Sequence, residues 1–154
     1  MLAVLLGSRA GELKRLAPVF AATLIRLRTR HPDLVCVVPT LPELAEPVRT
    51  LTRYWAARVI VTENDGDKYD AFKAATVALA CSGTVALELA LARLPAVIAY
   101  RVSPVTAFLY RRLIKARFAN LVNIMHDRLV VPEFLQERCR PEKLAAACEV
   151  LLTD

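Results

Sequence analysis

Residues 77–101 read VALACSGTVALELALARLPAVIAYR, and their pattern indicates the fold class of the chain. An apolar run at 77–80 ends in the small-residue turn 82–84, and a second apolar run follows at 95–99. The segment between them, 83–92, is apolar on nearly every side and has the length of a helix. A strand, a helix and a strand in this order form a βαβ unit, whose two strands lie parallel in one sheet.

Glu88 is the only charged residue of this expected helix before Arg93. An unpaired carboxylate in such apolar surroundings costs several kcal/mol, so a hydrogen-bonding partner is expected, either a ligand or one of the arginines Arg9 and Arg101. Thr84 lies four residues earlier on the same helix face, roughly 6 Å away along the helix axis. A helix N-terminus that holds an anion, with a carboxylate one turn deeper to accept hydroxyl groups, suits a nucleotide-sugar ligand.

The rest of the chain repeats the alternation of short apolar runs with segments of helical spacing. Further strands are expected at 2–6, 34–38 and 58–62, and a short sixth strand at 121–122. Further helices are expected at 12–30, 42–53, 69–74, 104–116, 132–137 and 141–152, with a polar loop at 63–68. This alternation predicts an α/β fold: a Rossmann-like three-layer αβα sandwich, with a mostly parallel sheet of about five to six strands, formed by residues 1–154 as one domain.

Composition sets bounds on the class of protein. Hydrophobic residues make up 56% of the 154 residues, which excludes a disordered chain, and no apolar run reaches the ~18 residues of a membrane span. The first residues lack the pattern of a signal peptide, and a strand that begins at residue 1 suggests a segment of a longer chain. The cysteines lack C-x-x-C spacing and are expected to be small core residues, so neither disulfides, a metal site nor a cofactor is expected: Cys36, Cys81, Cys139 and Cys148.

The carboxyl ends of the expected strands carry the candidate site residues. Ligands of a parallel sheet bind beyond these ends, so the segments there are expected to face one crevice: 7–9, 39–40, 63–67, 81–84, 100–101 and Asn123. Gly7 permits a tight turn, Ser8 follows it, and the next helix begins with free N–H groups. The guanidinium of Arg9 matches phosphate oxygens. The segment is neither a G-x-G-x-x-G motif nor a P-loop, which argues against dinucleotide binding and ATP hydrolysis.

The turn Ser82-Gly83-Thr84 has two compatible interpretations. Serine and threonine are preferred as helix caps, and the N–H groups of a capped helix also hold a phosphate. Arg101, which follows Tyr100 after the strand at 95–99, either reaches the anionic part of a ligand or pairs with a carboxylate.

Three later residues are weaker candidates. Asn123 lies among apolar neighbours, where its amide either binds a sugar or phosphate or fixes a turn. Glu133 and Gln136 open a later helix and are either ligand contacts or solvated surface. His126 has no nucleophile at a recognisable spacing, so a catalytic triad is not supported.

These residues, in this order and spacing, resemble those of a known family. The matching segments are 5–9 with Glu12, 31–34, 38–39, 82–88, 95–101, Asn123, 135–139 and 141–145. Almost end to end, the chain is similar to the C-terminal half of lipid-A-disaccharide synthase, a glycosyltransferase of Gram-negative bacteria. The Ser-Gly-Thr…Glu…Pro…Tyr-Arg pattern is shared loosely with other two-lobed UDP-sugar transferases, whereas Gly-Ser-Arg combined with Gln-Glu-Arg-Cys is more specific.

The resemblance implies a GT-B glycosyltransferase with two Rossmann-like lobes and an active site between them. This chain would be the donor-binding lobe, without the N-terminal acceptor lobe. Residues 7–9 and 82–84 would lie near the donor diphosphate, and Glu88 would hold the ribose hydroxyls. Arg101, Asn123 and Gln136 would lie around the donor sugar and the diphosphate.

The implied reaction joins UDP-2,3-diacylglucosamine to 2,3-diacylglucosamine 1-phosphate, inverts the anomeric carbon, and releases UDP and a β-1,6 disaccharide. The catalytic base is expected in the acceptor lobe, so the isolated chain is expected to be inactive. The family implies a cytoplasmic enzyme, peripherally bound to the inner membrane. Some members exchange C-terminal elements between subunits, which leaves a homodimer open.

Two other functions fit part of the sequence. Another two-lobed UDP-sugar enzyme, such as a UDP-N-acetylglucosamine 2-epimerase or the peptidoglycan N-acetylglucosaminyltransferase, uses a similar Gly-Thr…Glu segment. The net charge of +6, with basic clusters at 26–30 and 111–117, also fits a binding module for nucleic acid or membrane. Aromatic residues are only 6% and are not interleaved with the basic helix, so nucleic acid is not the expected partner.

Overall fold

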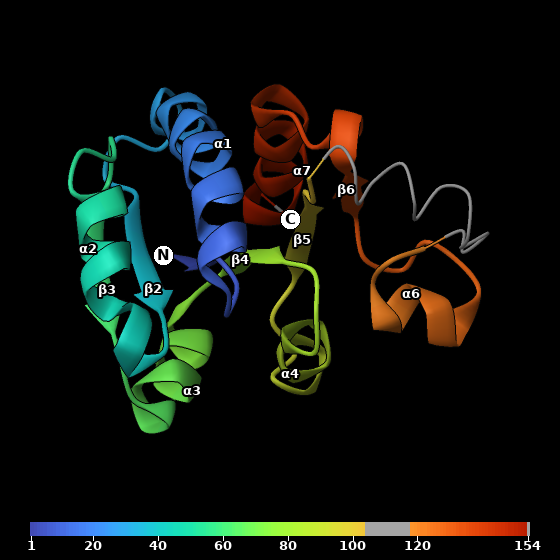
Figure 1. Cartoon of the computed structure of the whole chain (residues 1–154). Coiled ribbons are helices and arrows are strands. Elements are labelled where there is room, and N and C mark those ends of the chain that lie inside the picture. Colours follow the sequence, from blue (N-terminus) through green and yellow to red (C-terminus); the bar gives the residue numbers. More distant parts are fainter. Residues whose placement is uncertain (104–117, 154) are drawn as a thin grey trace.

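A six-stranded parallel sheet forms the centre of the computed structural model, which describes residues 1–103 and 118–153 (Figure 1). The strand order is β3-β2-β1-β4-β5-β6, and every neighbouring pair is parallel. The strands are β1 (Leu2–Leu5), β2 (Val35–Pro39), β3 (Arg58–Thr62), β4 (Val77–Cys81), β5 (Ala96–Tyr100) and β6 (Glu133–Leu135). The predicted Rossmann-like α/β fold is confirmed.

Helices cover both faces of this sheet. They are α1 (Ala10–Arg28), α2 (Ala45–Thr52), α3 (Asp65–Ala74), α4 (Val85–Leu91), α6 (Leu121–His126) and α7 (Pro141–Thr153), with short 3-10 helices at Pro42–Leu44 and Gln136–Arg138. Helices α1, α2 and α7 pack on one face, and α3 and α4 pack on the other (Figure 1). The expected helix at 104–116, with the basic cluster 111–117, lies outside the described residues.

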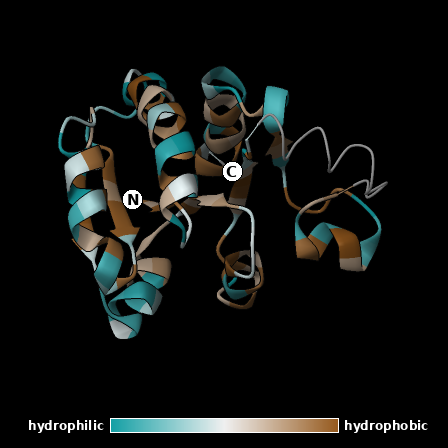
Figure 2. Cartoon of the chain, in the orientation of Figure 1, coloured by the Kyte–Doolittle hydropathy of each residue, from teal (hydrophilic) through white to brown (hydrophobic). Residues whose placement is uncertain are grey.

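Side chains along β1 alternate between the two faces of the sheet, because successive residues of a strand point to opposite sides. Leu2 and Val4 are fully buried on the α1 and α7 side, whereas Ala3 and Leu5 pack with Phe72 of α3 on the other side. The strands are accordingly hydrophobic, and the hydrophilic residues gather on the helices and loops (Figure 2). A strand buried on both faces reads as a continuous apolar run, which is why the sequence pattern identified it.

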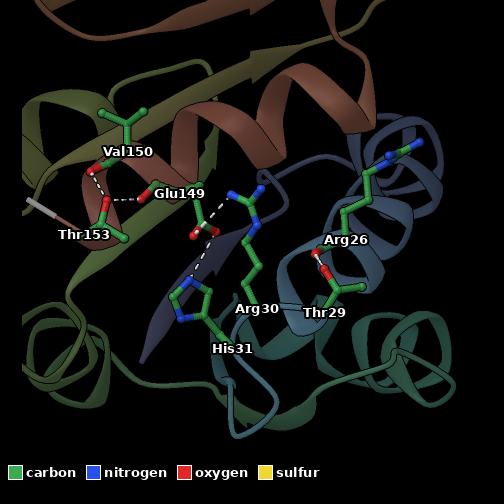
Figure 3. Close-up of polar contacts among 7 residues, drawn as sticks. All are labelled: Arg26, Thr29, Arg30, His31, Glu149, Val150 and Thr153. Atoms are coloured by element: carbon green, nitrogen blue, oxygen red, sulfur yellow. Dashed lines mark hydrogen bonds and ion pairs between the residues drawn. The ribbon is translucent and has the colours of Figure 1, made fainter.

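Helix α7 is tied to the end of α1 by one carboxylate (Figure 3). Glu149 lies 3.1 Å from the Nε2 atom of His31 and 3.7 Å from the Nη1 atom of Arg30. These contacts supplement the apolar packing of the two helices, in which Leu16 and Leu144 are fully buried. They lie where α1 returns to the amino end of β2.

Helix α3 begins earlier than expected. Residues 63–68 were expected to be a loop because of Gly66, but the helix starts at Asp65. The side chain of Asn64 accepts a hydrogen bond from the N–H of Asp67 at 2.7 Å, and acidic residues occupy the first turn. A cap and a favourable interaction with the helix dipole therefore outweigh the low helix propensity of glycine.

The region after residue 120 differs most from expectation. Residues 121–122 begin helix α6 instead of forming a strand, because Asn120 caps the helix through a 3.0 Å hydrogen bond from the N–H of Val122. Residues 132–137 were expected to be helical, but Glu133–Leu135 is strand β6, which pairs with β5. A three-residue edge strand is too short to show a periodicity.

All four cysteines are buried, as expected of small core residues. Burial raises the pKa of Cys36, Cys81 and Cys148 to about 12 and also raises the pKa of Cys139. Within residues 1–103 and 118–153, no helix is long and apolar enough to cross a bilayer.

Candidate functional site

The candidate site is a cleft of about 780 Å³ at the carboxyl ends of the central strands. Strand β1 pairs with β2 on one side and with β4 on the other. Successive strands are therefore added in one direction from β1 to β3 and in the opposite direction from β4 to β6, so the strand order reverses between β1 and β4. Ligands of open α/β sheets bind at such a switch point. The cleft is lined by residues 7–9, 39–42, 63–65 and 81–85, together with Leu5, Glu12, Lys68 and Glu88.

The turn after β1 is stabilised by a carboxylate from its own helix. Gly7 has a φ of +100°, and a Cβ atom added there would lie 2.3 Å from the Oε2 atom of Glu12. That oxygen accepts hydrogen bonds from the N–H groups of Ser8 (3.0 Å) and Arg9 (3.3 Å). Free N–H groups were expected at the start of the next helix; those of Ser8 and Arg9, in the turn itself, are already bound by Glu12.

The backbone N–H of Arg9 is bound by Glu12, but its guanidinium is available to a ligand. It lies 3.6 Å from the Oε1 atom of Glu12, its side chain is 82% exposed, and the residue lines the cleft. An exposed ion pair of this kind is weak in water, so the guanidinium can turn toward a phosphate at little cost.

The turn after β4 faces open space. A Cβ atom added to Gly83 would meet no heavy atom within 4 Å, so a ligand can approach this part of the backbone closely. Thr84 precedes α4 and makes no side-chain cap hydrogen bond. The hydroxyl of Ser82 donates to the carbonyl oxygen of Ala119 at 3.3 Å, which joins this turn to the loop before α6.

Glu88 faces the cleft and has a lysine as its partner. It lies on the first turn of α4, with 30% of its side chain exposed, and its Oε2 atom is 2.9 Å from the Nζ atom of Lys68 on α3. The same ammonium lies 3.4 Å from Asp65, and its pKa is raised, chiefly by the hydrogen bond to Glu88. Neither Arg9 nor Arg101, the two expected partners, makes this contact. Lys68 was missed because its segment was assigned to a loop.

The later candidates lie on or near β5, α6 and β6 and are not among the residues that line this cleft. Tyr100 pairs with Leu135 at the end of β5, and Arg101 follows it. Arg101 lowers the pKa of the nearby Cys139 thiol, against the larger effect of burial. Gln136 accepts a hydrogen bond from the N–H of Val102 at 3.4 Å. The expected crowding of 100–101 with 7–9 and 82–84 around one pocket is therefore not seen in the part of the chain that the structure describes.

Asn123 and Glu133 organise backbone segments. Asn123 is fully buried, its amide donates to the carbonyl of Val131, and its oxygen accepts from the N–H groups of Val130 and Val131, each at 2.8 Å. The Glu133 carboxylate accepts a 2.8 Å hydrogen bond from the N–H of Asn120. Of the two interpretations of Asn123, this geometry favours the one in which the amide fixes a turn.

Comparison with known proteins identifies the family. The sequence model of the lipid-A-disaccharide synthetase family matches residues 1–154. The chain belongs to this family. Among curated relatives it is 56% identical to the lipid-A-disaccharide synthase of Rhodospirillum centenum and 52% identical to that of Paramagnetospirillum magneticum, with 100% of this chain covered in both. These matches cover 38% and 40% of the relatives, so the chain spans about two fifths of their length.

A solved structure shows the same fold. The crystal structure of the Methanocaldococcus jannaschii UDP-GlcNAc 2-epimerase in complex with UDP-GlcNAc and UDP matches with a TM-score of 0.61 and 14% identity. The match covers 99% of this chain and 38% of that one. At this identity the likeness concerns the fold alone.

Proposed function

We propose that this chain is the donor-binding half of a lipid-A-disaccharide synthase and that it binds the UDP part of the donor in the cleft between β1 and β4. The observation that carries the proposal is the convergence of residues 7–9, 82–84 and Glu88 on one cleft at the switch point of the sheet. Membership of the family supports the same assignment.

The site residues take different roles in this proposal. The Arg9 guanidinium and the backbone of Ser82, Gly83 and Thr84 lie near the diphosphate, and the Glu88 carboxylate accepts the ribose hydroxyls. Arg101 and Gln136 lie toward the donor sugar, with Tyr100 at the end of the adjoining strand.

Asn123 and Glu133 have an indirect role in the proposal, because their polar groups are engaged with backbone. They hold the loops at 118–120 and 130–131 against β5 and β6. Gly7 keeps the first turn open for Glu12 and does not itself contact the ligand.

The whole protein is proposed to join UDP-2,3-diacylglucosamine to 2,3-diacylglucosamine 1-phosphate. The acceptor hydroxyl displaces UDP from the anomeric carbon with inversion, a base takes the hydroxyl proton, and hydrogen-bond donors of this chain stabilise the leaving diphosphate. We place the base in the N-terminal acceptor lobe, and the enzyme in the cytoplasm on the inner-membrane surface, where both lipid substrates reside. A homodimer is compatible with this arrangement.

Calorimetric titration with UDP tests the binding half of this proposal. The folded 154-residue chain is expected to bind UDP weakly, with Arg9→Ala weakening the affinity by about tenfold because one charge-assisted contact is lost. Arg53→Ala is the matched control, since Arg53 follows the end of α2, lies over the ring of Tyr54 and does not line the cleft. A folded sample that gives no heat with millimolar UDP would contradict the proposal.

A disaccharide-forming assay tests the catalytic half. The chain alone is expected to give no product from the two lipid substrates, because the base is proposed to lie in the acceptor lobe, whereas a complete relative under the same conditions is expected to give the disaccharide and UDP. Turnover by the 154-residue chain alone would show that the base lies within it.

A further inference from the structure

Lys68 connects the two helices that cover one face of the sheet, at the point where that face meets the cleft. Helix α3 follows β3 at the edge of the sheet, and α4 follows β4 near its centre (Figure 1). The Nζ atom of Lys68 lies 2.9 Å from the Oε2 atom of Glu88, and both residues line the cleft. Their side chains are 24% and 30% exposed, so the pair is partly shielded from water and open to a ligand on one side.

The surroundings of Glu88 give this contact its importance. The Oε2 atom is buried, and among the described residues its polar partner is the Lys68 ammonium, with no further side-chain or backbone donor. Removal of the ammonium would leave this partly buried carboxylate without its paired charge, which is costly unless the side chain turns toward water. An ionised carboxylate accepts about four hydrogen bonds, so one contact with Lys68 leaves room for ligand hydroxyls.

The other charges of the cleft do not substitute for Lys68. Arg9 makes its ion pair with Glu12 and not with Glu88, and the second carboxylate near the Lys68 ammonium is Asp65, whose side chain is 90% exposed. Lys68 also lies 4.9 Å from the ring centroid of Tyr69, which restricts the ammonium to the α3–α4 side of the cleft.

We propose that Lys68 is a positioning residue that holds the Glu88 carboxylate in the orientation in which it accepts the ribose hydroxyls of the nucleotide. The inference rests on the proposed function and adds to it the source of hydroxyl selectivity. A merely structural pair between α3 and α4 would, when removed, weaken all ligands alike. A positioning pair would, when removed, weaken only ligands that carry the hydroxyls.

The test compares the affinities of UDP and 2′,3′-dideoxy-UDP by NMR titration of the isotope-labelled chain. The unaltered chain is expected to bind UDP about tenfold more tightly, the discrimination given by a hydrogen bond to a charged acceptor. Lys68→Met is expected to reduce this ratio to about twofold or less, and Lys68→Arg to restore most of it because the charge remains. The dispersion of the amide spectrum reports in each case whether the variant is folded.

Lys73→Met is the matched control. Lys73 lies on the same helix, its Nζ atom pairs with Asp70 at 3.3 Å, and its side chain is 79% exposed away from the cleft lining. This variant is expected to keep the full ratio. Glu88→Gln removes the charge from the other side of the pair and is expected to lose the ratio as well, which checks the role of Glu88 in the proposed function. If Lys68→Met is poorly folded, Lys68→Gln, which also removes the ammonium, takes its place.

The outcomes separate the inference from the proposed function. An unaltered, folded chain that binds neither nucleotide overturns the proposed function and the inference with it. A chain that binds UDP and keeps the tenfold ratio in Lys68→Met overturns the inference alone. A chain that keeps the ratio in Glu88→Gln overturns the proposed role of Glu88 and the inference with it. Equal weakening of both nucleotides in Lys68→Met, with the ratio unchanged, assigns Lys68 a structural role and also overturns it.

Discussion

Glu12 brings a negative charge into the turn beside which an anionic ligand was expected to bind. Its carboxylate binds the N–H groups of Ser8 and Arg9 and fills the space beside Gly7. At the scale of single residues, the Gly-Ser-Arg segment thus shapes the wall of the cleft, and the exposed Arg9 guanidinium offers a mobile donor. The sequence showed that Gly7 ends a strand in a tight turn. It could not show which groups the turn would bind, because that depends on the side-chain conformation of Glu12.

Replacement of Gly7 by alanine tests this account of the turn. The positive φ disfavours a side chain, and the added Cβ would collide with Glu12, so Gly7→Ala is expected to lower the free energy of unfolding by about 1–3 kcal/mol. Gly11→Ala is the control, because its Cβ would meet only the flexible end of Arg15 in the first turn of α1. Urea unfolding followed by circular dichroism measures both. An unchanged stability of Gly7→Ala would contradict the assigned geometry.

Asn123 allows a ligand role to be distinguished from a structural one. Its amide makes three hydrogen bonds to the backbone of Val130 and Val131, so Asn123→Ala leaves buried groups unsatisfied and is expected to cost about 1–3 kcal/mol of stability. The affinity of the folded variant for UDP is expected to stay within about twofold of the original, as no ligand contact is lost. Unfolding and titration of the same sample check this. A large loss of affinity with full stability would instead support direct contact.

At the scale of elements, the interior strands could be predicted and the later segments could not. Strands β1, β2, β4 and β5 are buried on both faces and give continuous apolar runs, so their positions follow from the sequence to within about a residue. Helix α6 and strand β6 depend instead on a single cap at Asn120 and on three edge residues. Lys68 was not predicted as a site residue for the same reason, because a cap at Asn64 extends helix α3 into a segment that was expected to be a loop.

The packing of α7 on α1 is expected to stabilise the layer of helices on one face of the sheet. Leu144 is fully buried between them, so Leu144→Ala is expected to cost about 2–5 kcal/mol through lost burial and the cavity left behind. Val150→Ala on the same helix, with Val150 59% exposed, is expected to change stability by less than about 0.5 kcal/mol. Thermal or urea unfolding of the two variants gives the comparison. Similar losses in both would mean that α7 is not docked in this way.

At the scale of the whole molecule, the buried thiols report the integrity of the fold. Burial raises the pKa of Cys36, Cys81 and Cys148 from 9.0 to about 12, so at about pH 8 the folded chain holds very little thiolate. Reaction with a chromogenic disulfide reagent is expected to be slow in the native chain and fast at all four cysteines in concentrated guanidinium chloride. Rapid native labelling of any of these three cysteines would show that it is accessible.

The same burial sets a dependence of stability on pH. Above about pH 9 the thiols of the unfolded chain lose protons that the folded chain retains, so the unfolded state is favoured progressively as the pH rises from 9.0 toward about 12. The contribution of the cysteines to stability is therefore complete below pH 9.0 and declines above it. Urea midpoints of Cys36→Ala and of the original chain, measured across this range, are expected to converge as the pH rises. Parallel curves would exclude a contribution from Cys36.

The parallel arrangement of the sheet has a consequence for the order in which the chain becomes structured during its synthesis. Among the six strands of this sheet β1 is made first, yet its partner β4 is complete only when residue 81 has left the ribosome. Until then one edge of the most apolar strand stays open, and its backbone groups can pair with any other extended chain nearby. Nascent chains that stop before β4 are therefore expected to aggregate or to bind chaperones. Chains that extend past β5 are expected to do neither.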